Sequence, residues 1–395
     1  MADTTFTILG MTGAGKTCYL LSMYYKMCGG MRGYMLTTDD DTDVNLRKRY
    51  ARMCDSSLEA NRFQPGTDSL SDYEFNLEYA FKPIMSFAWK DYPGGALAEK
   101  NDGNLADYNQ IKSSIMNSSA LFICVDGELL AGDDMDDKID NLKDNCGNVI
   151  TPFFSKYLKE NKKLPPTAIV VTKYDKCKED TDVEELCEIV EEVFSPFFVD
   201  DNGETQRLVT VIPVSIGKNI EADDYAGKLK PLNIHLPIFM GIWFGIQNTI
   251  EAKYAEIEVL KQRRSNIYNS NIQSRRKNIE QIDALRDEID ENRKKISKEK
   301  DRFFLWRSDD DIKDMENRIE SLQRSIENSR TAIQRIDGDN SASMITEKMN
   351  KLKDIVDINK KYGNRLLKEL DKIDIIYVNG ERRESFSKID IKKED

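Results

Sequence analysis

The residues best suited to chemistry form a glycine-rich loop, Gly10 to Thr17, between the apolar run Phe6 to Leu9 and a helix-like stretch. Such glycines let backbone N–H groups turn toward a phosphate, and the helix N-terminus adds partial positive charge. The spacing places Lys16 on the β- and γ-phosphates and the Thr17 hydroxyl on Mg²⁺. The sequence therefore predicts a nucleotide-phosphate site. Its expected residues are Gly10, Thr12, Gly13, Ala14, Gly15, Lys16, Thr17 and Cys18.

A second motif, Asp91-Tyr92-Pro93-Gly94, ends the apolar run 84–89. An aspartate in this position can hold a Mg²⁺-bound water, and a glycine can offer its N–H to the γ-phosphate. Asp91 is therefore a predicted metal-site residue, and Gly94 a predicted catalytic residue together with Lys16.

Base recognition is expected from Thr172-Lys173-Tyr174-Asp175, which follows the β-branched run 168–171. The Asp175 carboxylate can accept hydrogen bonds from both N1–H and the exocyclic amine of guanine. Adenine lacks that pair of donors, so the motif favours a guanine nucleotide. Ser215 and Ile216, after the strand-like segment 208–214, are expected to brace the base.

Together these motifs resemble the Ras-like P-loop GTPases over roughly residues 4–248. The resemblance implies GTP or GDP with Mg²⁺ as ligands. It also implies a switch threonine that acts in catalysis and binds the metal, for which Thr67 is preferred over Thr37 and Thr38. The loop sequence and Gln64-Pro65-Gly66-Thr67 look like the prokaryotic double-GTPase family of bacterial conflict systems. The forms of the second and third motifs look like dynamin-type large GTPases, which are the second choice.

One departure from the Ras-like pattern concerns hydrolysis. Gly95 stands where a glutamine usually orients the attacking water, so slow intrinsic hydrolysis is expected. Arg62 is a candidate arginine finger supplied in cis. The alternative, which is the more common case, is a solvated arginine at the end of a helix.

Composition narrows the classes of partner. The net charge is −12: by count the first 248 residues carry about −14, and the remaining residues about +2. An acidic nucleotide domain makes nucleic acid an unexpected partner. Seven isolated cysteines and one histidine, His235, disfavour a metal cluster or a cysteine–histidine catalytic pair. With no basic, apolar leader at Met1, a cytoplasmic location is expected.

The expected fold is α/β: a doubly wound, mainly parallel sheet, followed by an antiparallel helical arm and a small β-hairpin. A GTPase domain is predicted over 1–248, and its last helix is placed at 236–246. The run 236–246 is too short to span a bilayer. Strands are predicted at 5–9, 73–81, 84–90, 120–126, 167–172 and 208–214.

Beyond residue 248, heptad-like apolar spacing predicts an antiparallel coiled-coil hairpin over 249–336. A further helix is expected over 341–372, and Asn379-Gly380 predicts a β-hairpin within 373–395. The apolar tip Phe303-Phe304-Leu305-Trp306 could dock on a membrane or protein, or could close the hairpin itself.

The motifs favour a GTP-hydrolysing switch or mechanochemical protein that signals to a protein partner through its helical arm. A scaffold that binds GTP and barely hydrolyses it, and a dynamin-like membrane-associated GTPase, are the alternatives. ATP hydrolysis would require the match at Thr172 to Asp175 to be accidental.

Overall fold

The structure is a computed structural model that describes residues 4–55, 57–58, 62–63, 70–97, 105–161, 163–198, 207–217, 230–302 and 308–389. The chain divides into two compact units. The first combines Met1–Ile250 with Asn359–Asp395, and the second is Glu251–Ile358.

The first unit is built on one mixed sheet. Within the described residues, nine strands follow the order β2-β3-β4-β1-β5-β6-β7-β8-β9. The central strands β4, β1, β5, β6 and β7 are parallel, and antiparallel pairs complete both edges. The strands are β1 (Thr4–Leu9), β2 (Tyr34–Thr37), β3 (Ser71–Tyr79), β4 (Lys82–Asp91), β5 (Ala120–Asp126), β6 (Thr167–Thr172), β7 (Leu208–Pro213), β8 (Ile375–Val378) and β9 (Glu381–Arg383).

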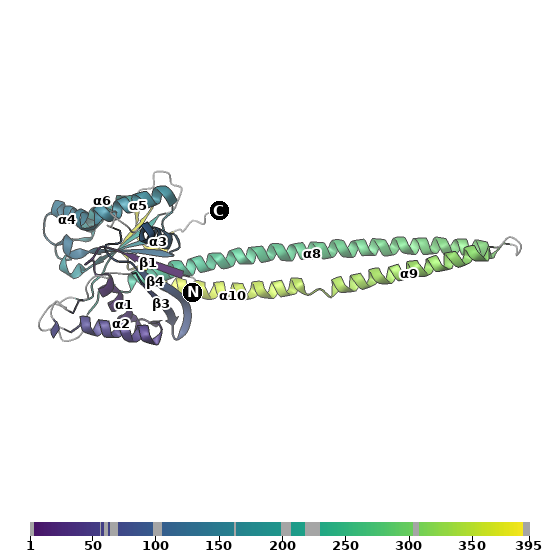
Figure 1. The fold of residues 1–395 in the computed structure, drawn as a ribbon, viewed down its shortest axis with the longest axis horizontal. Helices are drawn as coiled ribbons and strands as arrows, with labels where there is room; N and C mark the ends of the chain where they lie inside the picture. Colours follow the sequence, from purple (N-terminus) through teal and green to yellow (C-terminus); the bar gives the residue numbers. More distant parts are fainter. Residues whose placement is uncertain are drawn as a thin grey trace. The chain divides into compact units, whose positions relative to one another are not determined.

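Helices cover both faces of this sheet, as the continuous burial of β5 and β6 requires (Figure 1). On one face, Leu9, Ile123 and Val171 share a core with α3, α4, α5 and α6. On the other face, Tyr19 of α1 packs on Trp89. The helices are α1 (Lys16–Cys28), α2 (Asp40–Met53), α3 (Leu105–Met116), α4 (Met135–Leu142), α5 (Asn148–Asn161), α6 (Val183–Val193), α7 (Ser195–Phe198), α8 (Leu236–Lys300), α9 (Asp309–Asp337) and α10 (Ser341–Leu370).

The predicted α/β class with a parallel central sheet and a long helical region toward the C-terminus is confirmed. Two details differ from the prediction. The expected last domain helix at 236–246 and the expected arm helix are one continuous helix, α8. The strands β8 and β9 pair with each other on either side of Asn379-Gly380, as expected, but β8 also pairs with β7, so the two strands extend the main sheet.

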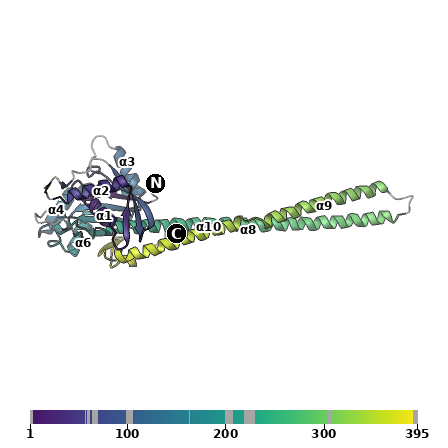
Figure 2. The same cartoon turned by 90° about the horizontal axis from the view of Figure 1, so that it is seen from below.

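In the second unit, α8 packs on α9 and on the first part of α10, which follow one another alongside it (Figures 1 and 2). One apolar cluster joins Ile257 and Leu260 of α8 to Met349 and Leu352 of α10. A second cluster joins α8 to α9 and contains Ile282, Ile289, Leu322 and Ile326. Of the helices described, none has a stretch long and apolar enough to cross a membrane. The tip residues 303–306 lie outside the described residues.

Candidate nucleotide-binding site

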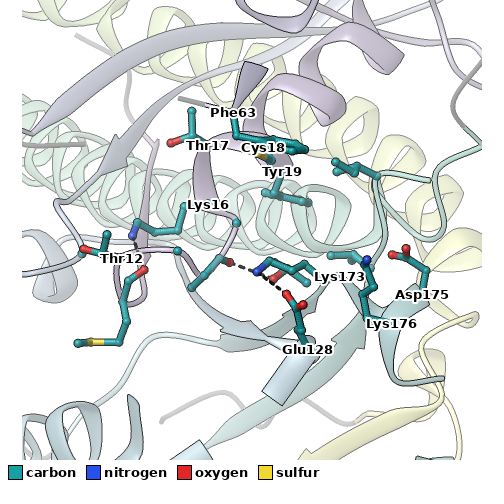
Figure 3. Close-up of a pocket in the computed structure, with 18 of the residues that line it drawn as sticks. Thr12, Lys16, Thr17, Cys18, Tyr19, Phe63, Glu128, Lys173, Asp175 and Lys176 are labelled. Atoms are coloured by element: carbon teal, nitrogen blue, oxygen red, sulfur yellow. Dashed lines mark hydrogen bonds and ion pairs between the residues drawn. The ribbon is translucent and has the colours of Figure 1, made fainter. Parts of the chain in front are cut away.

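A pocket of about 390 Å³ opens where the carboxyl ends of the parallel strands meet the N-terminus of α1. Figure 3 shows Thr12 and Lys16 at one end of it and Asp175 at the other. Ligands of open α/β sheets bind at this edge. The lining residues are Met11, Thr12, Gly13, Ala14, Gly15, Lys16, Thr17, Cys18, Tyr19, Phe63, Gly94, Glu128, Thr172, Lys173, Asp175, Lys176, Val214, Ile216 and Gly217.

The loop between β1 and α1 forms the first end of the pocket. Gly15 has φ +74 and caps α1 in the left-handed conformation, which a side chain would strain. The Lys16 ammonium group donates to the carbonyl oxygens of Gly10 (2.7 Å) and Met11 (3.3 Å). Burial lowers the pKa of Lys16, and the Asp91 carboxylate opposes that shift. The loop therefore holds a buried cation beside several backbone N–H groups, which suits a phosphate chain.

Asp91 ends β4 beside Ile8 of β1, so both strands deliver their ends to this loop. Its side chain is only 2% exposed, and its Oδ1 atom has no hydrogen-bond partner among the described residues. Burial raises the pKa of Asp91 to about 6, although Lys16 and Arg49 favour the charged form. A buried carboxylate oxygen without a partner is costly unless a cation or water binds it. Asp91 therefore fits the predicted role of binding metal through water.

Thr172 and Lys173 connect the two ends of the pocket. The Thr172 hydroxyl lies 3.0 Å from the carbonyl oxygens of both Ala14 and Val125, so it ties β6 to the phosphate loop. Lys173 forms ion pairs with Asp126 (2.6 Å) and Glu128 (3.2 Å). These pairs hold the aliphatic part of Lys173 along the middle of the pocket (Figure 3).

Asp175 lies at the far end and is held by Ser215. The Ser215 hydroxyl accepts from the Gly217 N–H (3.0 Å) and donates to Asp175 Oδ1 (2.5 Å). The backbone of the same two loops is also joined, because the Tyr174 N–H donates to the Val214 carbonyl (3.1 Å). A carboxylate held in this way can accept two parallel hydrogen bonds from a planar ligand.

Most of the predicted site residues meet at this pocket. Gly10, Asp91 and Ser215 do not line the pocket, but each interacts with a residue that does. Gly10 accepts a hydrogen bond from Lys16, the Asp91 carboxylate attracts the Lys16 ammonium group, and Ser215 donates to Asp175. Thr67 lies outside the described residues. Thr38 donates to the Glu74 carbonyl (2.7 Å). Arg62 is buried and its guanidinium lies 4.9 Å from the ring centre of Phe63.

Several lining residues were not predicted from the sequence. Phe63 offers an apolar ring and Glu128 a carboxylate, and neither belongs to a motif with fixed spacing. Glu128 had a weak signal, since it comes two residues after Asp126, where the buried strand β5 ends, and the other motifs also follow strand ends. The others are Met11, Tyr19, Lys176, Val214 and Gly217.

Comparisons with known proteins give one kind of match. No protein-family model matches the chain, and no curated protein is similar to it. Two crystal structures of the GTPase-like domain of Ski7 from S. cerevisiae, one bound to GTP and one to GDP and inorganic phosphate, align with a TM-score of 0.30. They are 16% and 15% identical, and the alignments cover 54% of this chain and 42% and 43% of theirs. The chain thus spans less than half of either. So slight a likeness assigns no family, and the resemblance of the motifs to Ras-like and double-GTPase proteins remains a prediction.

Proposed function

We propose that the chain binds GTP with Mg²⁺ and hydrolyses it to GDP. The observation that supports this most is that Lys16 and Asp175 line opposite ends of one pocket (Figure 3). A triphosphate at the first end and a guanine at the second would satisfy both groups in a single ligand. Phe63 and the Lys173 side chain offer apolar surfaces on which the planar base can stack.

The chemistry proposed is transfer of the γ-phosphoryl group to water. Lys16 and the loop N–H groups stabilise negative charge on the phosphate oxygens, and the Gly94 N–H contributes a further donor. The Thr17 hydroxyl and, through water, Asp91 would hold Mg²⁺, and Thr67 is proposed as its further ligand. The metal would neutralise charge between the β- and γ-phosphates.

The guanine assignment is tested by replacing one carboxylate oxygen of Asp175 with an amide NH2 group. In Asp175→Asn, the amide offers one acceptor and one donor, which match N1–H and the 2-oxo group of xanthine. We expect GTP affinity to fall at least about 100-fold, as lost charged hydrogen bonds imply, and XTP affinity to rise. Titration with fluorescent GTP, XTP and ATP measures this. Unchanged GTP binding, or ATP bound as tightly as GTP by the unaltered protein, would overturn the assignment.

A second candidate is a protein that binds GTP without turning it over, because Gly95 has no side chain to orient water. Single-turnover hydrolysis separates the two: a rate equal to that of GTP in buffer favours the scaffold. In either case we propose a cytoplasmic protein whose bound nucleotide is read by a protein partner through the helical second unit. A membrane-associated, dynamin-like role would be carried by the tip at 303–306.

A further inference from the structure

The second unit carries a stripe of exposed residues on α8, beside the face that packs on α9 and α10. The stripe is Lys261, Tyr268, Ile272, Ile279, Asp283 and Asp290. Steps of seven and four residues keep these positions within about 60° around the helix axis. Tyr268 is 63%, Ile272 47% and Ile279 39% exposed. Exposed apolar residues in a row mark an interaction surface more often than isolated ones do.

The position of the stripe within the unit is distinctive. Its central part, from Tyr268 to Ile279, lies where α9 ends and α10 begins, between the cluster around Leu260 and the cluster around Ile282. There α8 makes polar contacts with the break: Arg275 pairs with Asp337 (3.3 Å), and Asn271 donates to Asp339 (3.1 Å). In this interval Tyr268, Ile272 and Ile279 of α8 are exposed.

Charge along α8 changes sign at the stripe. Residues 259–279 contain six basic residues and no acidic one, whereas residues 280–291 contain six acidic residues and one arginine. The basic residues are Lys261, Arg263, Arg264, Arg275, Arg276 and Lys277, all of them exposed. An acidic protein or an anionic membrane would attract the basic part, but Asp283 and Asp290 on the same stripe would repel it.

The stripe is complementary to itself when a second copy runs in the opposite direction. We propose that the chain forms an antiparallel dimer through α8, with the two-fold axis between Arg275 and Arg276. Ile272 then meets Ile279 of the second copy, Tyr268 can donate to its Asp283, and Lys261 pairs with its Asp290. The members of each pair are equally distant from the axis in the sequence, as two-fold symmetry requires.

The arginines at the axis do not prevent this pairing. Arg275 pairs with Asp337, and Arg276 with Glu280 at 2.9 Å. Lys261, Asp283 and Asp290 have exposed pairs of the same kind, with Glu258, Arg286 and Arg293, and these pairs would be exchanged for pairs across the interface. A parallel dimer would instead place Lys261 on Lys261 and Asp290 on Asp290. The order of charges thus selects the antiparallel arrangement, as charged flanking positions do in coiled coils.

The test is the mass of the full chain in solution, by sedimentation equilibrium and light scattering. We expect a dimer for the unaltered protein. The double variant Ile272→Asp and Ile279→Asp should raise the dimer dissociation constant at least about ten-fold, because it removes the apolar centre of the interface. Val259→Asp is the matched control, since Val259 is an exposed apolar residue (67%) about 160° around the helix from Lys261. It should leave the mass unchanged.

A charge exchange tests the orientation. Lys261→Glu and Asp290→Lys should each weaken the dimer, and the two changes together should restore it. A monomer at every concentration, or a dimer that survives the double aspartate variant, would overturn the proposal. A dimer that the combined charge exchange does not restore would overturn the antiparallel arrangement. Circular dichroism and nucleotide titration of each variant establish that both units remain folded.

Discussion

Gly94 packs directly on the backbone of Met11: a Cβ atom built at Gly94 would lie 2.6 Å from the Met11 carbonyl carbon. Real Cβ atoms do not approach so closely, so Gly94→Ala must displace the phosphate loop or its own segment. We expect nucleotide affinity to fall at least about ten-fold, the change produced by 1.4 kcal/mol. Gly95→Ala is the control, because a Cβ there meets no described atom within 4 Å. Equal affinities for the two variants would contradict the prediction, and isothermal titration measures both.

The open space at Gly95 allows a test of the slow hydrolysis that the sequence predicts. Gly95→Gln places an amide next to Gly94, where it can orient a water toward the γ-phosphate. We expect the single-turnover rate to rise about ten-fold or more, with little change in GTP affinity. Gly95→Leu supplies similar bulk without hydrogen bonds and should not accelerate hydrolysis. Equal rates for the two variants would show that water orientation does not limit the reaction.

Ser215 positions the carboxylate of Asp175 through a single hydroxyl. Ser215→Ala removes a hydrogen bond to a charged group, worth about 1.5–3 kcal/mol. We therefore expect guanine nucleotide affinity to fall roughly ten-fold or more, with less change in the binding of inorganic triphosphate. Ser86→Ala, which removes an exposed hydroxyl bonded to Asn76, is the control. A Ser215→Ala variant with unaltered GTP affinity would count against this role for the hydroxyl.

The single histidine predicts a pH dependence of stability. His235 is 8% exposed, and burial lowers its pKa to about 4 against the attraction of the Glu369 carboxylate. In the unfolded chain His235 takes up a proton near pH 6.5, whereas in the folded chain it does so only near pH 4. Stability from the neutral histidine is therefore present above pH 6.5 and is lost as pH falls toward 4, by up to about 3 kcal/mol.

In His235→Gln this part of the pH dependence should disappear. Urea unfolding of both proteins between pH 4.5 and 7.5 gives the difference in their unfolding free energies. We expect the unfolding free energy of the unaltered protein to fall relative to that of His235→Gln as the pH is lowered. A difference that stays constant with pH would refute the role of His235.

The motifs of the site could be predicted because phosphate chemistry fixes both residue types and spacing. Lys16, Gly94, Thr172 and Asp175 line one pocket even though they come from separate parts of the chain. The strands that precede these motifs are parallel, so their carboxyl ends lie at the same edge of the sheet, and β6 was recognisable in the sequence as a buried β-branched run. Phe63 was not predicted, because a single aromatic residue in a polar segment has no periodic signal.

The parts of the fold that were missed depend on contacts between distant residues. β2 has four residues, Tyr34–Thr37, and is held by pairing with β3 rather than by its own pattern. The composition changes from apolar to charged near residue 248 because α8 is buried before this point and largely exposed after it. The change does not mark a helix end, since α8 continues to Lys300. Gly241 lies against Phe122, so it is favoured by close packing and does not interrupt the helix.

The neighbouring strands β7 and β8 are separated in the sequence by α8, α9 and α10. During synthesis on the ribosome, β7 therefore emerges long before the strand that covers its edge. Until then β7 has an unpaired edge that can form hydrogen bonds with a strand of another nascent chain. Its apolar side chains Val209 and Val211 can pack on that chain as well. A protein truncated before residue 375 should consequently aggregate, even though every predicted phosphate and base motif has already been made.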